Sequence, residues 1–242
     1  MRFWKNEYQL RAKDFDKYNN IKPSAVLDLF QDAACRHAEE LGVGFDAMLA
    51  RSYLWVLTRI NFKIVSVPEK YQRVTVKTWP LAPNRFLYRR EYCIENENGE
   101  PLIKGSSEWA VIDCEKRRLV ADPHLYSFYE GFCTEVMLED KLARVRNFDH
   151  DGNGYEIRAG FCELDANDHV NNTEYADYVM NAVVPDEGEM LDVFKIDYRK
   201  ELLAGERLHV FREKGENEVL AKGINDNGEV VFACEYSFTH RQ

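Results

Sequence analysis

The sequence predicts an α+β protein built from two copies of one unit, each an antiparallel sheet wrapped around a single helix. Two observations lead to this prediction. The two halves of the chain repeat the same local patterns in the same order, and each half places one helical pattern before a run of strand-like segments. We therefore expect a first unit over residues 1–125, a connector over 126–148 and a second unit over 149–242.

The duplication is visible as three local matches between the halves. Residues 16–28 align without a gap with residues 165–177, and Asn20 falls where His169 stands in the second copy. Because all the matches keep one order, they indicate a fused duplication rather than chance similarity. The positions that carry the matches are Asp16 with Asp165, Asp28 with Asp177, 60–63 with 196–199, and 98–100 with 227–229.

Each copy contains one predicted helix. In the first copy the helix is expected to begin at Pro23–Ser24 and to end near Gly42. In the second copy Asn172 is expected to cap a helix that ends at Pro185. Apolar residues recur in both at the spacing of three or four that lays one stripe along a helix. These stripes are Val26, Leu29, Phe30, Ala33, Ala34 and Leu41, then Tyr175, Tyr178, Val179, Ala182 and Val183.

Strand-like segments follow each helix. They are rich in β-branched and aromatic residues, and Asn98–Gly99 and Asn227–Gly228 indicate tight hairpin turns. The stretch 125–146 between the copies is expected to be partly helical and to connect them. Either unit alone would leave sheet edges unpaired, and joining two units covers those edges. The predicted strands are 54–67, 74–79, 86–95 and 102–113, then 191–201, 207–213, 218–225 and 230–239.

The composition narrows the class of protein. The 242 residues carry a net charge of −10 and no long basic run, which argues against a nucleic-acid partner. No apolar run approaches the roughly 20 residues that a membrane span needs, and residues 1–7 contain no apolar signal core. Six cysteines without a C-x-x-C pair favour reduced thiols in the cytoplasm over disulfides or a metal site. No nucleotide or phosphate-loop motif occurs, so no cofactor and no metal are expected.

The segment before the second helix carries the candidate chemistry. Asp165, Asn167 and His169 occupy alternate positions, so in an extended backbone their side chains would face one cavity. The start of the helix would add backbone N–H groups where an oxyanion develops. The alternative is a polar loop whose Asp and Asn residues only stabilise turns. The duplication favours the site, because the first copy keeps Asp16 but has Asn20 in place of the histidine.

Residues 167–172, NDHVNN, and Tyr175 resemble the N-x-H-V-N-N-x-x-Y signature of the acyl-acyl carrier protein (acyl-ACP) thioesterases. Residues 198–201, YRKE, are similar to the family's Y-R-x-E segment, and residues 79–80 and 86–90 also resemble the family. The similarity covers nearly the whole chain. It implies two fused hotdog units, of which the second is catalytic, in a bacterial member that lacks the plastid-targeting extension of plant relatives.

The resemblance implies an activity and a set of site residues. The activity is hydrolysis of fatty acyl-ACP to free fatty acid and ACP in fatty acid biosynthesis, with Asp165, Asn167, His169 and Glu201 in the site. Plant relatives often have a cysteine directly after the glutamate, and Leu202 stands there in this chain. A Cys–His–Asn mechanism is therefore not expected, and a positioned water is expected to attack the thioester. The base is left open between Glu201, Asp165 and His169.

The resemblance also implies ACP, an acidic protein, as the partner. A chain of charge −10 needs a local basic patch to dock it. The family places its acyl pocket largely in the first unit, and whether the fused pair forms a homodimer is left open. The candidate patches are Arg85, Arg89 and Arg90, and Lys116, Arg117 and Arg118.

Three rival functions share much of this pattern. A hotdog thioesterase acting on acyl-coenzyme A would use the same chemistry and differ only in its docking surface. A hotdog dehydratase would not need a glutamate placed like Glu201. A silent module that binds acyl chains or ACP would bind without turnover, and replacing His169 or Glu201 would not change hydrolysis.

Overall fold

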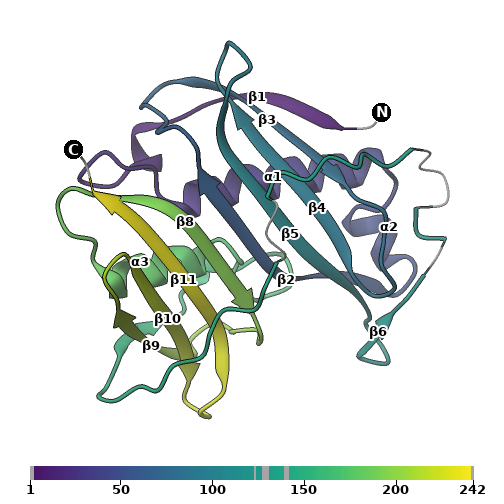
Figure 1. Ribbon diagram of the computed structural model, residues 1–242. Helices are drawn as coiled ribbons and strands as arrows, with labels where there is room; N and C mark the ends of the chain where they lie inside the picture. Colours follow the sequence, from purple (N-terminus) through teal and green to yellow (C-terminus); the bar gives the residue numbers. More distant parts are fainter. Residues whose placement is uncertain (1–2, 123, 127–130, 139–141, 241–242) are drawn as a thin grey trace. The chain divides into compact units, whose positions relative to one another are not determined.

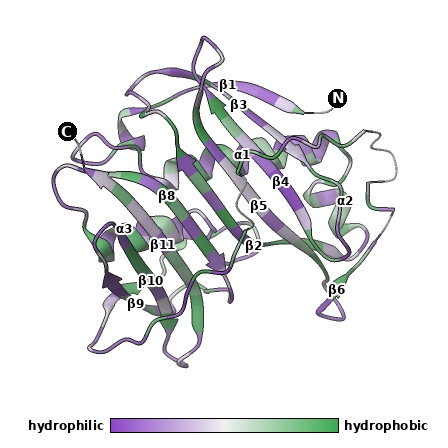
Figure 2. Cartoon of the chain, viewed as in Figure 1, coloured by the Kyte–Doolittle hydropathy of each residue, from purple (hydrophilic) through white to green (hydrophobic). Residues whose placement is uncertain are grey.

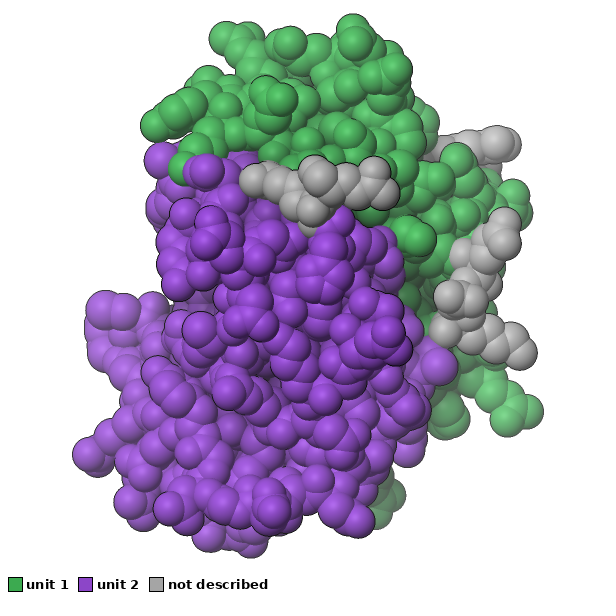
Figure 3. All heavy atoms as spheres, turned by 60° about the vertical axis from the view of Figure 1, so that its left-hand side comes forward, with its two compact units in different colours: residues 1–11, 28–142 green, residues 12–27, 143–242 purple. Residues whose placement is uncertain are grey.

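The computed structural model describes residues 3–122, 124–126, 131–138 and 142–240 (Figure 1). It divides into two compact units, residues 1–11 with 28–142 and residues 12–27 with 143–242 (Figure 3). The sequence boundaries at 125 and 149 stay a prediction. Among the described residues no helix combines the length and the apolar character needed to cross a bilayer.

The first unit is an antiparallel sheet with strands in the order β1-β3-β4-β5-β2, and β6 pairs with β5. Two helices accompany it, and α1 belongs to this unit from Asp28 onward. The elements are β1 Trp4–Gln9, α1 Pro23–Glu40, α2 Phe45–Leu49, β2 Tyr53–Ile64, β3 Arg73–Pro80, β4 Tyr88–Glu95, β5 Pro101–Asp113 and β6 Arg118–Val120.

Phe30 of α1 fixes the helix against the first sheet. Its side chain is fully buried, stacks on Tyr92 with ring centroids 4.3 Å apart and meets Phe62 edge-on at 6.3 Å. Gly105 of β5 leaves room for this ring, because a Cβ there would lie 2.3 Å from Phe30 Cε2. Figure 2 shows that apolar residues lie mainly in the strands and helices, whereas most loops are polar.

The second unit repeats this plan with strands in the order β8-β11-β10-β9-β7. Helix α3 packs on the sheet through Tyr175, whose ring lies 5.5 Å from that of Phe232. The helix ends before Pro185, with Val184 in the left-handed conformation at a φ of 50°. The elements are β7 Tyr155–Arg158, α3 Glu174–Val183, β8 Glu189–Tyr198, β9 Arg207–Lys214, β10 Glu218–Asn225 and β11 Val230–His240.

The structure confirms the predicted duplication element by element. Each copy runs through a strand, a short 3-10 helix, an α-helix and four strands, as β1, α1 and β2 to β5 and as β7, α3 and β8 to β11. The hairpins also agree, since Asn96 Oδ1 and Asn225 Oδ1 each accept two backbone N–H groups of their turns. Gly99 and Gly228 supply the positive φ, 80° and 77°, that these turns need.

All eight predicted strands are present, but three expectations were wrong or incomplete. The strands β1, β6 and β7 were not predicted, because they are short and carry no continuous apolar pattern. The stretch 125–146 contains no helix in its described residues, and 127–130 and 139–141 lie outside them. Helix α3 begins one residue after Thr173 rather than at an Asn172 cap, and Asn171 Oδ1 accepts the Thr173 N–H at 3.1 Å.

The contact between Gly105 and Phe30 generates a stability prediction. Gly105→Ala should lower the free energy of unfolding by about 1–3 kcal/mol, because the added methyl group overlaps a ring that has no space to move. Gly160→Ala is the control, since the nearest atom to its Cβ is 3.7 Å away, and it should stay within about 0.5 kcal/mol. Urea unfolding measures both, and equal midpoints for the two variants would contradict the packing described.

Candidate active site

The segment that carries the histidine is a closed turn. Asp165 Oδ1 accepts the backbone N–H groups of Asn167 at 2.8 Å and His169 at 3.3 Å. The Asp165 N–H donates to the His169 carbonyl at 2.7 Å, and Asp168 has a φ of 61°. The extended backbone expected over 165–169 is therefore wrong. The reason is that the Asp165 carboxylate satisfies N–H groups of its own loop and folds it back.

The first copy forms the same turn. Asp16 Oδ1 accepts the N–H groups of Tyr18 at 2.8 Å and Asn20 at 2.9 Å, and Asn19 has a φ of 65°. Because the turn at residues 16–20 has no histidine, these bonds serve folding rather than chemistry. Asn20 itself is buried and donates from Nδ2 to the Glu189 carbonyl at 2.9 Å. At this position the first copy therefore has a structural anchor.

The second copy places an imidazole and a carboxylate together. His169 Nε2 lies 3.5 Å from Glu201 Oε2, and their side chains are 29% and 48% exposed. The backbone holds this arrangement, since His169 forms a bridge with Leu203 and the Val170 N–H donates to the Leu202 carbonyl at 2.8 Å. The loop after β8 is thus fastened to the turn, and the pair remains open to water and substrate.

The four predicted site residues take different positions. The side chains of His169 and Glu201 meet, and Asp165 contacts the backbone of His169. The Asn167 side chain is exposed, and within the described part of the chain its carboxamide makes no hydrogen bond. The structure therefore brings together an imidazole–carboxylate pair and the aspartate that holds its turn.

Two tyrosines support this site, and sequence reasoning noted neither as a site residue. Burial raises the pKa of Tyr175, whose hydroxyl also has a hydrogen bond with the Leu202 backbone and feels the charges of Asp165 and Glu201. Burial likewise raises the pKa of Tyr198, whose hydroxyl donates to the Asn172 carbonyl at 2.9 Å. Both hydroxyls are neutral at physiological pH. Their signal was present, because both belong to the tyrosine positions of the two motifs.

The start of α3 offers fewer free backbone N–H groups for an oxyanion than the sequence suggested. The Glu174 N–H donates to the Asn171 carbonyl at 3.0 Å, and the Ala176 N–H donates to the Thr173 carbonyl at 3.2 Å. These two groups are occupied and do not serve as oxyanion donors in this conformation.

The arginine cluster expected to dock ACP is largely used within the first unit. Arg89 Nε donates to the fully buried Glu91 at 2.6 Å, and the same carboxylate accepts Ser106 Oγ at 2.7 Å and the Met137 N–H at 2.8 Å. Arg89 is therefore neutralised by a buried partner, and the expectation that it forms part of an open basic patch was wrong.

Arg90 is withdrawn from the surface by burial. It is 6% exposed and donates from Nη1 to His37 Nδ1 at 3.0 Å and to Thr78 Oγ1 at 3.2 Å. Burial, together with the Arg90 charge, lowers the pKa of His37 to about 3, so the imidazole is the neutral acceptor of this bond. A docking role for Arg90 is therefore wrong as well.

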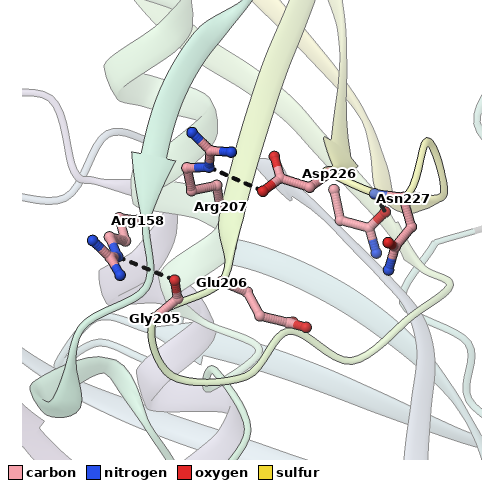
Figure 4. A pocket seen from close by; sticks show the side chains of 7 residues that line it. Arg158, Gly205, Glu206, Arg207, Asp226 and Asn227 are labelled. Carbon is pink, nitrogen blue, oxygen red and sulfur yellow. Dashed lines mark hydrogen bonds and ion pairs between the residues drawn. The ribbon is translucent and has the colours of Figure 1, made fainter.

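A pocket of about 460 Å³ lies at the far end of the loop that carries Glu201 (Figure 4). Arg158 Nε donates to the Gly205 carbonyl at 3.1 Å, and Arg207 Nε pairs with Asp226 at 2.9 Å. The Leu203 N–H donates to the Glu206 carboxylate at 2.8 Å. One loop therefore joins the candidate site to a polar pocket. Its lining residues are Arg158, Gly205, Glu206, Arg207, Asn225, Asp226 and Asn227.

The paired turns generate a prediction about stability. Asp165→Ala and Asp16→Ala should each lower the free energy of unfolding by about 1–2 kcal/mol, because two backbone N–H groups lose their acceptor. Asp165→Asn and Asp16→Asn keep that oxygen and should stay close to wild type. Urea unfolding of the four variants checks this. Asparagine variants as unstable as the alanine variants would show that the negative charge, rather than the acceptor, holds the turns.

Comparison with proteins of known sequence places the chain in a family. Residues 2–124 match the model of the acyl-ACP thioesterase N-terminal domain, and residues 146–240 match that of the C-terminal domain. The chain is 23% identical to oleoyl-acyl carrier protein thioesterase 2 of Arabidopsis thaliana, over 94% of this chain and 68% of the relative. It is 27% identical to a palmitoyl-acyl carrier protein thioesterase of Gossypium hirsutum, over 80% of this chain and 51% of the relative. The chain thus spans about half to two thirds of these chloroplastic relatives.

Solved structures agree on the fold. The chain superposes on an acyl-ACP thioesterase from Bacteroides thetaiotaomicron with a TM-score of 0.91 and 21% identity, covering 98% of each chain. It superposes on the 12:0-ACP thioesterase from Umbellularia californica with a TM-score of 0.88 and 22% identity, covering 100% of this chain and 98% of the other. These matches confirm the predicted fold of two fused hotdog units. Because the two family models together account for most of its length, the chain belongs to the acyl-ACP thioesterase family.

Proposed function

We propose that this protein hydrolyses fatty acyl-ACP to free fatty acid and ACP in fatty acid biosynthesis. Membership of the acyl-ACP thioesterase family supports the reaction and the substrate class. The observation that carries the proposal is the His169–Glu201 pair, with Nε2 and Oε2 3.5 Å apart and both side chains partly exposed. The first copy carries no such pair at the matching turn, where Asn20 is a buried anchor.

In the proposed mechanism a water molecule attacks the thioester carbonyl directly. Glu201 accepts a proton from this water as the new carbon–oxygen bond forms. The carbon–sulfur bond then breaks, and the proton passes through His169 to the leaving thiolate. Leu202 supports this route, because its side chain is apolar and fully buried and offers no nucleophile, while its backbone carbonyl accepts the Val170 N–H. A thioester needs little further activation, since its thiolate leaves readily.

The remaining site residues have positioning and binding roles in this proposal. Asp165 holds the turn that presents His169, and Tyr175 and Tyr198 support the segments on either side. Asn167 is assigned to substrate contact, because its exposed carboxamide has a donor and an acceptor that bond no described residue.

Location and assembly complete the proposal. All six cysteines are unpaired, which supports a reducing compartment, and we retain the cytoplasm as the predicted location. A homodimer of the fused pair also stays a prediction.

His169 and Glu201 give the decisive test of the activity. His169→Ala and Glu201→Gln should each lower kcat on acyl-ACP by roughly 100-fold or more, because each removes a group that moves a proton. The measurement is fatty acid release from a panel of acyl-ACP and acyl-coenzyme A substrates, which also tests the substrate class.

His209 supplies the control for that test. It forms a second imidazole–carboxylate pair in the same unit, with Nε2 3.4 Å from Asp226 Oδ1 and similar exposure. His209→Ala should leave kcat within about twofold of wild type, because the imidazole–carboxylate pair that it removes lies outside the proposed site. Turnover that survives in both site variants would contradict the assignment. Acyl binding without any turnover in the wild-type protein would favour a silent binding module.

Cys162 distinguishes direct water attack from a thiol nucleophile. It is exposed and is the cysteine nearest in sequence to the site turn. Cys162→Ser should retain kcat within about twofold, because the proposed mechanism forms no acyl-enzyme. A loss of several orders of magnitude, with an acylated Cys162 detected by mass spectrometry in the wild type, would replace this mechanism by a covalent one.

A further inference from the structure

Two large apolar side chains are exposed beside the site. Phe161 is 87% exposed and lies in the short 3-10 helix Phe161–Glu163, directly before the Asp165 turn. Leu203 is 45% exposed and forms a bridge with His169. Extending the alignment of residues 16–28 with 165–177 four residues towards the N-terminus pairs Phe161 with Ala12, and each of the two begins the 3-10 helix of its copy. Because the fold tolerates alanine there, an exposed phenylalanine points to contact with a partner.

Backbone bonds place these two side chains on neighbouring segments. The Ala159 N–H donates to the Glu206 carbonyl at 3.0 Å, and the Gly205 N–H donates to the Ala159 carbonyl at 2.8 Å. The two segments therefore run antiparallel. Phe161 lies two residues after Ala159, and Leu203 lies two residues before Gly205, so the two residues occupy neighbouring positions on the paired segments. Both residues border the turn that carries His169, so a molecule seated on them lies at the edge of the site.

A cation without a carboxylate partner accompanies this apolar surface. Arg158 is exposed, and its Nε donates to the Gly205 carbonyl at 3.1 Å. Within the described ranges Arg158 makes no ion pair, whereas Arg207 pairs with Asp226 at 2.9 Å. Figure 4 shows the Arg158 guanidinium separate from that ion pair. The remaining N–H groups of Arg158 are thus available to a carboxylate of a partner.

We propose that Phe161, Leu203 and Arg158 form the docking surface for the acidic carrier protein, an inference that rests on the proposed function. The partner has to dock within reach of the arm that carries its thioester, and Phe161 and Leu203 lie beside the turn that carries His169. A protein of net charge −10 needs a local cation to receive an acidic partner, and Arg158 supplies one. Aromatic and arginine side chains are also the residues that contribute most to protein interfaces.

The test compares a substrate that carries the protein partner with one that does not. Phe161→Ser and Arg158→Glu should each raise KM for acyl-ACP roughly tenfold or more, with kcat unchanged. The same variants should hydrolyse acyl-pantetheine, which has no protein part, within about twofold of wild type. Arg158→Lys keeps the charge and should recover most of the affinity. Phe45→Ser, at an exposed phenylalanine of α2, is the control and should change neither substrate.

Binding of ACP bearing a non-hydrolysable acyl amide makes the test independent of turnover. The two surface variants should weaken this binding by the same factor as they raise KM, and Arg158→Glu should also reduce its dependence on salt. A loss of activity on acyl-pantetheine equal to the loss on acyl-ACP would overturn the inference. Surface variants that change neither the KM for acyl-ACP nor the binding of ACP would also overturn it. A wild-type protein that proves dimeric and that Phe161→Ser converts to a monomer would also overturn it, in favour of a second copy. Tight ACP binding without hydrolysis would refute the proposed function alone.

Discussion

The hydrogen bonds that Asp165 Oδ1 accepts from the backbone of Asn167 and His169 are the constraint on which the site depends. They close a turn of five residues and fix where the imidazole leaves the backbone. The bridge between His169 and Leu203 then brings in the loop that carries Glu201. Because these contacts use the main chain, the reacting side chains stay exposed. The site is therefore held together by backbone contacts, and its side chains remain partly exposed.

Duplication explains how such a site arises within this fold. The turn at Asp16 has the same hydrogen bonds as the turn at Asp165. The turn geometry is therefore a property of the fold and does not depend on the histidine. The second copy adds His169 and Glu201 to that geometry, and the first copy uses Asn20 to anchor a neighbouring strand. Two similar turns thus differ in the side chains that they present.

Much of the fold could be predicted because it depends on local pattern. Helix periodicity and hairpin turns located α1, α3 and the eight predicted strands, since each signal lies within one segment. The family motifs indicated His169 and Glu201, and the structure brings these side chains together. The folded turn at Asp165 was the alternative that the sequence itself offered, since its bonds join residues only two and four positions apart. The burial of Arg90 was missed because its partners, His37 and Thr78, are distant in sequence and are set by the folded chain.

In the proposed function the chemistry takes place at the turn of the second copy. A crystal structure with a non-hydrolysable acyl-pantetheine amide tests this directly. The amide carbonyl carbon should lie within about 4 Å of a water held between His169 Nε2 and Glu201 Oε2. An amide carbonyl bound at the Asp16 turn near Asn20, with the His169–Glu201 pair unoccupied, would contradict it.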